Sequence, residues 1–316
     1  MGTNRSESAF SDCTLCDDAA HTEDIDYGYR TLIDYDENGN PSYSDRPLTL
    51  DDFLEPEEGD VYLQGNVHVD DVYRLKSIFR HHLRDRKNVT VYSDLKIIWG
   101  MEGIPNPAPD ISIFKDVKDP KKSREHFYVP EEGVRPFFIL EVVSPIYRDP
   151  DVNKKPEIYR KAGVSEYMII DPGLENKEIS YTVSGYSLID GEYVKMRPDS
   201  RGRFHSMTTD VHISVSESGD RFIVYDARLG KVLLPADERA ELEKTRADNA
   251  KIRAELAKSR ADNAESRAEL AKSRANNAEI QVAKIQAELA KTRADNTEKE
   301  IIRLKAKMKA MGISAD

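Results

Sequence analysis

The chain has 316 residues, a length that suits one or two domains, and 33 % of them are charged, with a formal net charge of −11. This acidic balance argues against strong, sequence-independent binding of nucleic acid by the whole surface, while it leaves room for a local basic groove. The sequence contains no apolar run of about 18 residues and no basic-then-apolar signal at its start, so we expect a cytoplasmic protein that does not span a membrane.

The first 45 residues are rich in Asp, Glu, Ser, Asn and Gly and poor in aliphatic side chains. The first 60 residues carry about all of the net negative charge, and their three basic side chains are Arg5, Arg30 and Arg46. A segment of this composition cannot bury enough apolar surface to offset the entropy that is lost on ordering. We therefore expect residues 1–45 to form a largely disordered acidic tail.

Both cysteines of the chain lie in this tail, as the CxxC pair Cys13 and Cys16. Such a pair can form half of a structural zinc site, but that site needs four ligands, and His21 is the one further candidate nearby. We therefore favour two free thiols over a metal site.

Residues 46–235 show the alternating helix and strand patterns of a mixed α/β domain. Apolar residues recur every three or four positions over residues 68–86, which predicts an amphipathic helix. Residues 89–99 alternate and are rich in β-branched and aromatic side chains, which predicts a strand, and the glycines and prolines that follow predict a loop. Two more strands are expected at 111–114 and 137–143, and the continuous apolar character of the second indicates burial on both faces.

The second half of this domain is expected to begin with a short helix over residues 156–162. Pro156 suits the first turn of that helix, and Gly163 suits its end. A fourth strand, 166–170, is expected to stop at Asp171-Pro172, and hairpins are expected from residue 178 to residue 234. The turns of these hairpins are predicted at Ser184-Gly185, Asp190-Gly191 and 218–220.

In the last third of the chain the composition changes to Ala, Glu, Lys, Arg, Asp and Asn. A seven-residue segment recurs identically after 14 residues, at Glu255 and Glu269, and alanines alternate at spacings of three and four. This seam continues in larger apolar residues, at Val282, Ile285 and Leu289. The pattern is typical of a coiled coil, so we expect residues 236–312 to form one and to link copies of the chain into a homo-oligomer. A solvated single helix, held by alanine propensity and charge pairs, is the alternative.

Three residues of the central segment have the types and positions of a metal-dependent hydrolytic site. Asp110 directly precedes a short strand, Glu141 lies inside an otherwise apolar strand, and Lys155 opens the short helix. A buried carboxylate is costly unless it is paired or binds a cation, so Asp110 and Glu141 on adjacent strands are expected to hold one Mg²⁺ or Mn²⁺. The metal would activate water at a phosphate ester, and a nearby lysine would orient that water or stabilise the transition state.

Taken singly, each of these residues has an ordinary structural interpretation. An aspartate after proline is more often a turn residue. A glutamate inside a strand often pairs with a cation, and a lysine at a helix start is usually solvated. The combination of the three residue types in this order is what favours the functional interpretation.

The segment that carries these residues resembles a known protein family. The strings PDISIF (109–114), ILEVVSP (139–145) and KKPEIYRKAGVSEYMIIDP (154–172) are similar to the Uma-two family of restriction endonuclease-like proteins. The most specific part of the resemblance is Tyr159, Ala162-Gly163-Val164, Glu166-Tyr167 and Asp171-Pro172. The likeness extends more loosely over residues 50–235.

The resemblance implies a fold, a site and a substrate. The fold would be that of the PD-(D/E)XK nucleases, a mixed sheet flanked by helices, over residues 46–235. Asp110 and Glu141 would be the metal carboxylates, and Lys155 matches the place of the family's lysine. The resemblance thus implies a Mg²⁺-dependent endonuclease that hydrolyses the phosphodiester bonds of nucleic acid, with DNA as the expected substrate.

Two positions depart from the usual PD-(D/E)XK pattern. The position two residues after Glu141, where lysine is usual, is Val143, so activity depends on Lys155 reaching in from the helix. Pro156 directly after Lys155 is also unusual. A second hypothesis therefore stays open, in which a catalytically silent domain serves as an interaction module or scaffold that is assembled through its coiled coil.

A small basic cluster at the end of the long predicted helix is the remaining candidate for function. Its members are Arg80, His81, His82, Arg84, Arg86 and Lys87. These side chains could contact phosphate groups. We favour the simpler interpretation that cations stabilise the C-terminus of a helix.

Overall fold

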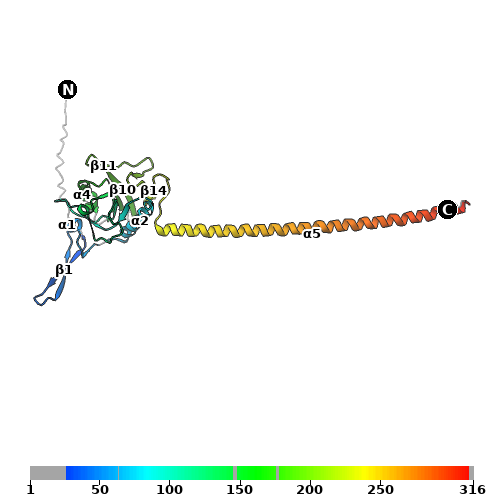
Figure 1. Cartoon of the computed structure of the whole chain (residues 1–316), viewed down its shortest axis with the longest axis horizontal. Coiled ribbons are helices and arrows are strands. Elements are labelled where there is room, and N and C mark those ends of the chain that lie inside the picture. The colour runs from blue at the N-terminus through cyan, green and yellow to red at the C-terminus, as the bar shows by residue number, and fades with distance from the viewer. Residues whose placement is uncertain (1–25, 63, 145–147, 176–177, 313–316) are drawn as a thin grey trace, which may run out of the picture. The chain divides into compact units, whose positions relative to one another are not determined.

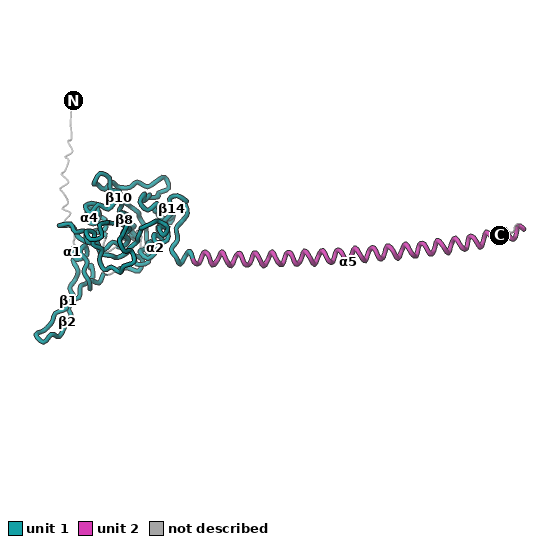
Figure 2. The backbone as a smooth tube through the Cα atoms, in the orientation of Figure 1, with its two compact units in different colours: residues 1–239 teal, residues 240–316 magenta. Residues whose placement is uncertain are grey.

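The computed structural model describes residues 26–62, 64–144, 148–175 and 178–312. The chain divides into two compact units, residues 1–239 and 240–316, which Figure 2 distinguishes by colour. The first unit is a mixed α/β domain around a six-stranded sheet, and the second consists of the greater part of a long C-terminal helix (Figure 1). The first unit therefore has the α/β class that the sequence predicts.

The helices are α1 (Leu50–Leu54), α2 (Asn66–His82), α3 (Val129–Glu132), α4 (Lys155–Ala162) and α5 (Ala236–Ala310), with a π-helical turn, η1 (Pro150–Lys154), directly before α4. The strands of the central sheet are β4 (Val89–Tyr92), β6 (Ile111–Lys115), β8 (Pro136–Val142), β9 (Glu166–Glu175), β10 (Glu178–Ile189) and β11 (Glu192–Lys195). Three smaller sheets are formed by β1 (Tyr29–Tyr35), β2 (Pro41–Pro47) and β3 (Asp60–Val61), by β12 (Phe204–Ser206), β13 (Val211–Val215) and β14 (Phe222–Asp226), and by β5 (Lys96–Ile98) and β7 (His126–Tyr128).

The central sheet is mixed, with the strand order β11-β10-β9-β8-β6-β4. β8 and β9 run parallel, and every other neighbouring pair in this sheet is antiparallel. Parallel neighbours need a crossover connection, and here it contains η1 and α4. β8 lies in the middle of the sheet and is buried on both faces, as its continuous apolar sequence predicts.

Side chains of the sheet alternate between two hydrophobic cores, because successive residues of a strand point to opposite faces. Phe138, Leu140 and Val142 of β8 pack in one core with the buried stripe of α2 and with β13 and β14. Ile139 and Val143 pack in the other core with α4, β5 and β7. Glu141 follows the same alternation, so it belongs to the face that α4 covers.

The two helices that flank the sheet confirm the predicted ones, with shifted ends. α2 buries a stripe that includes Val72, Leu75 and Phe79 against the sheet. α4 carries proline in its first turn and ends at Gly163, whose φ of +76° lies in the left-handed region that favours glycine. The chain is thereby turned from α4 directly into β9.

β1 and β2 form a hairpin, so the expectation of disorder over residues 1–45 is wrong for residues 29–45 (Figure 1). Arg30 joins β1 to β3, because its Nε and Nη2 donate to the carboxylate of Asp60 at 2.6 and 2.9 Å. Arg46 binds Asp52 of α1 through two hydrogen bonds of 2.8 and 2.9 Å. Arg30 and Arg46, the two described arginines of this acidic stretch, therefore pair with its carboxylates. Outside the described residues lie Cys13, Cys16 and His21.

The strand predicted over residues 89–99 is wrong in one respect, because the segment forms two strands, β4 and β5, that belong to different sheets. Asp94 separates them with a left-handed φ of +52°. Its backbone N–H donates to the carbonyl oxygen of Pro109 at 3.0 Å instead of to a strand neighbour. The chain therefore bends at a residue type that tolerates this conformation.

Two further strand ends differ from the prediction. β9 continues through Asp171-Pro172. Its pairing with β8 ends at Ile170, so Pro172 has a neighbouring strand on one side alone, β10, and a proline is tolerated at such an edge position. β10 continues through Gly185, where a Cβ atom would lie 2.9 Å from Sδ of Met196, so the glycine serves close packing and not a turn. The turns predicted at Asp190-Gly191 and at 218–220 are confirmed.

α5 has 75 residues and none of them is buried. Its large apolar side chains are exposed, and among them Ile285 keeps 64 % of its accessible surface. The helical part of the prediction for residues 236–312 is confirmed, and pairing with a second helix stays a prediction. Among the residues described here, no helix is long and apolar enough to cross a membrane.

Candidate active site

Asp110 and Glu141 are buried side by side, at the start of β6 and within the neighbouring strand β8. The backbone N–H of Asp110 donates to Oε2 of Glu141 at 3.2 Å. The backbone N–H of Val142 donates to Oδ2 of Asp110 at 2.7 Å. Each carboxylate is therefore held by the backbone beside the other, which fixes the two acidic groups as a pair.

Lys155 reaches this pair from α4. Its Nζ lies 3.0 Å from Oε1 of Glu141 and 2.7 Å from Oδ1 of Asp151, which stands one turn earlier in η1. Tyr159, one turn later, donates its hydroxyl hydrogen to the same Oε1 of Glu141 at 2.6 Å. Residues four apart share one face of a helix, which is why Lys155 and Tyr159 both reach Glu141, while Asp151 contacts Lys155 from the preceding turn.

His68, in the first turn of α2, is the second cationic group of the cluster. Its Nε2 lies 3.3 Å from Oδ1 of Asp110, and the residue is 7 % exposed. Within the described part of the chain its buried Nδ1 has no hydrogen-bond partner. That nitrogen is available to a water molecule or to a ligand.

The three carboxyl groups of the cluster differ in the direction of their pKa shifts. Burial raises the pKa of Glu141 to about 8, an increase that Lys155 opposes and Asp110 reinforces. Burial also raises the pKa of Asp151. Burial acts in the same direction on Asp110, but the hydrogen bond and charge of His68 outweigh it and lower the pKa of that carboxyl. Asp110 is therefore the group that stays ionised most readily.

The two cationic groups keep their protons at neutral pH. Burial alone would lower the pKa of His68, but the hydrogen bond and charge of Asp110 raise it to about 9. Burial likewise opposes the charge of Lys155, and the neighbouring Asp151 and Glu141 nevertheless raise its pKa above the usual value. The site thus presents an imidazolium and an ammonium beside three carboxyl groups.

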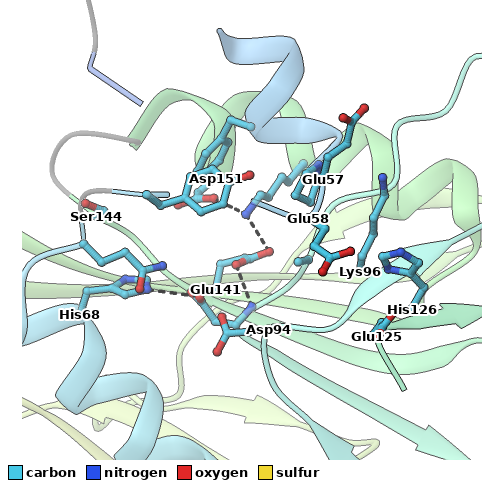
Figure 3. Close-up of a pocket in the computed structure, with 17 residues that line it drawn as sticks. Glu57, Glu58, His68, Asp94, Lys96, Glu125, His126, Glu141, Ser144 and Asp151 are labelled. Atoms are coloured by element: carbon cyan, nitrogen blue, oxygen red, sulfur yellow. Dashed lines mark hydrogen bonds and ion pairs between the residues drawn. The ribbon is translucent and has the colours of Figure 1, made fainter. Parts of the chain in front are cut away.

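The cluster forms one side of a cavity of about 400 Å³ (Figure 3). In the close-up His68 lies to the left of Glu141, Asp151 lies above it, and Lys96 and His126 lie to its right. The remaining wall comes mainly from the segment around α1 and from β7, with Phe53, Glu57, Glu58, Tyr62 and Glu125. A cavity of this volume is in the range of small-molecule sites and accommodates a nucleotide-sized group.

The donors fit a hard divalent cation. Carboxylate oxygens are the ligands that Mg²⁺ prefers, and the three carboxyl groups outnumber the two protonated bases beside them. In residues 26–312, apart from the undescribed gaps, no three or more His, Cys, Asp or Glu side chains are arranged as a ready-made metal cage. Mg²⁺ sites often use one or two carboxylates and take their other ligands from water and a phosphate.

The structure brings together all three residues that the sequence singled out, Asp110, Glu141 and Lys155. Val143, at the usual lysine position, packs in the core. The ammonium group comes instead from Lys155 of α4, which contacts Glu141 although Pro156 follows it directly. Sequence reasoning missed His68, which looks like a core residue of the α2 stripe. It also missed Asp151, which the spacing of four residues to Lys155 could have indicated.

Residues 51–216 match the Uma2 family, whose description is "Putative restriction endonuclease". The match covers more than half of the chain. The chain belongs to the Uma2 family. The Uma2 segment begins in α1 and ends just after β13, so it contains the whole cluster around Glu141 and excludes α5.

One matching solved structure is a crystal structure of "a putative nuclease belonging to DUF820 from Anabaena variabilis ATCC 29413". It is 20 % identical to this chain, and the alignment covers 53 % of this chain and 95 % of that one, with a TM-score of 0.37. No curated protein matches the chain. The assignment therefore rests on the Uma2 match itself.

Proposed function

We propose that the Uma2 domain of this chain is a divalent-metal-dependent endonuclease that hydrolyses phosphodiester bonds of nucleic acid, with DNA as the expected substrate. The observation that carries the proposal is the pair Asp110 and Glu141, each held by a backbone N–H of the neighbouring strand segment, with the ammonium group of Lys155 beside them in one cavity. Membership of the Uma2 family, with its description "Putative restriction endonuclease", supports it.

Asp110 and Glu141 are the residues that would hold Mg²⁺ or Mn²⁺. When bound, the cation supplies an activated water and neutralises charge on the phosphate. The backbone hydrogen bonds to both carboxylates keep their oxygens in place before substrate arrives, so little reorganisation is needed. Tyr159 holds Oε1 of Glu141 and thereby orients the opposite oxygen of that carboxylate.

Lys155 acts in this proposal as a cation and not as a base. Its raised pKa keeps the ammonium group protonated at neutral pH, so it cannot accept a proton from water. It can donate a hydrogen bond to a phosphate oxygen and stabilise the negative charge that develops there. Asp151, at 2.7 Å, is the positioning residue that holds Nζ on the cavity side of α4.

Nicking of supercoiled plasmid in the presence of Mg²⁺ or Mn²⁺ tests the proposal. We expect the wild type to cleave, Asp110→Asn and Glu141→Ala to lose cleavage, and Lys155→Ala to be slower by roughly 10²-fold or more. Glu157→Ala, at an exposed position of α4, is the matched control and should cleave like the wild type. Circular dichroism of each variant separates loss of chemistry from loss of fold.

The absence of cleavage by any variant and by the wild type, with both metals and with DNA and RNA, would overturn the proposal. The silent scaffold assembled through α5 would then be the better account of this chain. Cleavage that survives in Glu141→Ala would also count against the assigned site.

We propose in addition that α5 associates with α5 of a second copy as a coiled coil. The seam positions Val282, Ile285 and Leu289 are 53, 64 and 52 % exposed, which is a row of apolar side chains without cover on an isolated helix. We expect the partner to be a second copy of the chain. The segment that is repeated at Glu255 and Glu269 carries the same seam and charges of both signs, so the helix is complementary to itself.

A further inference from the structure

A second cavity of about 480 Å³ lies along the C-terminal half of α2. It is completed by residues 236–239, the first turn of α5, which belong to the first compact unit. Four of the side chains around it are cations, Lys76, Arg80, Arg84 and Arg239, and within the described residues its lining includes no carboxylate. Positive charge is therefore concentrated here without an acidic counterpart in the wall.

His81 stands at the centre of this group. Nη1 of Arg84 lies 2.8 Å from its Nδ1, and Nη1 of Arg239 lies 2.6 Å from the same atom. Burial lowers the pKa of His81, and the charges of Arg239 and Arg84 lower it further, so the ring is neutral. A neutral imidazole has one acceptor nitrogen and cannot satisfy two guanidinium groups. Nε of Arg239 also donates to the carbonyl oxygen of Leu234 at 3.1 Å, but the Nη1 atoms of Arg84 and Arg239 share a single acceptor nitrogen.

Other members of the basic cluster at the end of α2 already have partners. Arg86 donates to the carbonyl oxygen of Thr208 at 2.7 Å and pairs with Asp210, and His82 contacts the carbonyl oxygen of Thr209. These contacts connect the C-terminal end of α2 to the loop before β13, so Arg86 and His82 have a structural role. Arg84 pairs with its exposed neighbour Asp85, an ion pair that contributes little in water.

We propose that this cavity is a phosphate-binding site, separate from the cavity that contains Glu141. Guanidinium groups bind phosphate oxygens through paired, charge-assisted hydrogen bonds, and an oxyanion would supply the acceptors that the cluster around His81 lacks. The site does not depend on the proposed nuclease function, because none of its residues belongs to the first cavity.

The position on α2 keeps the two cavities apart. Arg80 follows His68 by twelve residues, which corresponds to roughly 18 Å along a helix axis at 1.5 Å per residue. At about 100° per residue, the positions of Tyr73, Ser77 and Arg80 lie roughly 120–180° around the helix from that of His68. A single phosphate group therefore cannot contact both sites.

Two sources of the phosphate group share this chemistry. One is a phosphodiester of a nucleic-acid backbone, held at a distance from the scissile bond. The other is a free phosphate or phosphate monoester. The experiment therefore uses inorganic phosphate and a labelled duplex oligonucleotide as separate probes, with the full chain in EDTA so that no cleavage occurs.

Isothermal titration with phosphate and fluorescence anisotropy with the duplex should be run on the wild type, Arg84→Gln, Arg239→Gln and the control Arg246→Gln. Arg246 lies on exposed α5 and pairs with Glu243, so it has the same charge outside the cavity. We expect roughly tenfold weaker binding of at least one probe in both cavity variants, since a hydrogen bond to a charged group is lost. The control should bind like the wild type.

The binding of the two probes by the four proteins either identifies the source of the phosphate group or overturns the proposed site. Loss of inorganic phosphate binding in both cavity variants supports a free phosphate ligand. Loss for the duplex alone supports a backbone phosphate, and a smaller salt dependence of duplex binding should accompany it. Equal binding by all four proteins for both probes would overturn the site while leaving the nuclease proposal untouched. Arg84→Gln keeps the test valid if Arg239→Gln proves unstable, since Arg84 is exposed.

Discussion

Replacement of Lys155 by methionine should destabilise the protein in a way that depends on pH. The lysine side chain is 5 % exposed, and it pairs with Glu141 and Asp151, whose side chains are 1 and 5 % exposed. Methionine keeps the approximate length and removes the charge, so two carboxyl groups lose their cation. Breaking a buried ion pair in this way costs about 3–5 kcal/mol.

The cost should increase with pH. The folded-state pKa of Glu141, about 8, lies above its ordinary value of 4.5, so the folded state binds this proton more tightly than the unfolded chain does. The contribution of Glu141 to stability is therefore highest below pH 4.5 and is lost as the pH rises through 8. Without Lys155, the pKa values of Glu141 and Asp151 rise further. At pH 6 Glu141 already carries its proton and Asp151 can bind one, whereas at pH 8.5 both groups must bind protons at greater cost.

The magnitude follows from the linkage relation. One bound proton changes the free energy of unfolding by at most about 1.4 kcal/mol per pH unit. We expect Lys155→Met to lose about 3 kcal/mol at pH 8.5 and at least about 1 kcal/mol less at pH 6. The matched control is Lys161→Met on the same helix, where a 47 % exposed lysine pairs with Glu157 and should contribute less than about 1 kcal/mol.

Denaturation in urea, followed by tryptophan fluorescence, measures this difference. Trp99 is the one tryptophan of the chain, it is buried, and its ring lies 6.2 Å from that of Tyr159 on α4, so it reports on the core beside the site. A loss below about 1 kcal/mol at pH 8.5, or an equal loss at both pH values, would refute the reasoning.

Four further outcomes are expected. The affinity for Mn²⁺ should fall as the pH drops from 8 to 6, because Glu141 must lose a proton to bind a cation, and titration calorimetry in two buffers should detect the released proton; a flat profile would contradict the raised pKa of Glu141. Phe79→Ala should lower the free energy of unfolding by about 3–5 kcal/mol, since this ring is fully buried between α2 and the sheet, and urea denaturation would measure it. Glu166→Gln should cost about 1–3 kcal/mol by the same assay, because its carboxylate accepts hydrogen bonds from Ser206 and the two residues after it, which an amide cannot all satisfy. Ile285→Glu should reduce the sedimentation coefficient of the full chain by disrupting the α5 pair, and an unchanged value would contradict the coiled-coil proposal.

Among the site residues that the sequence predicted, Glu141 has the most informative context, a charge inside an apolar strand. Glu141 interrupts a continuous apolar strand, and such a residue needs a partner wherever it is found. The partners are harder to predict, because burial and helix periodicity alone make His68 look like a core residue. Asp151 lies four residues before Lys155, a spacing that indicates contact if the segment is helical, but the π-helical form of this proline-rich connection could not be predicted from its sequence.

The errors in the fold have a different physical origin. The β1–β2 hairpin was missed because its strands bury little: Ile33 and Tyr43 are 51 and 67 % exposed, so hydrophobic patterning gave no signal. The strands are instead fastened by Arg30 and Arg46 to carboxylates of the following segment. Composition describes an average over a segment, and it cannot show that a few guanidinium groups are placed to pair with specific acids.

The repeat in α5 makes its length adjustable in steps. A unit of 14 residues equals two whole heptads, so gain or loss of one unit returns every following side chain to the same face of the helix. Each step changes the helix by roughly 21 Å, at 1.5 Å per residue. Sequences that differ by whole units would therefore carry the same domain on arms of different reach, with the chemistry of the arm unchanged.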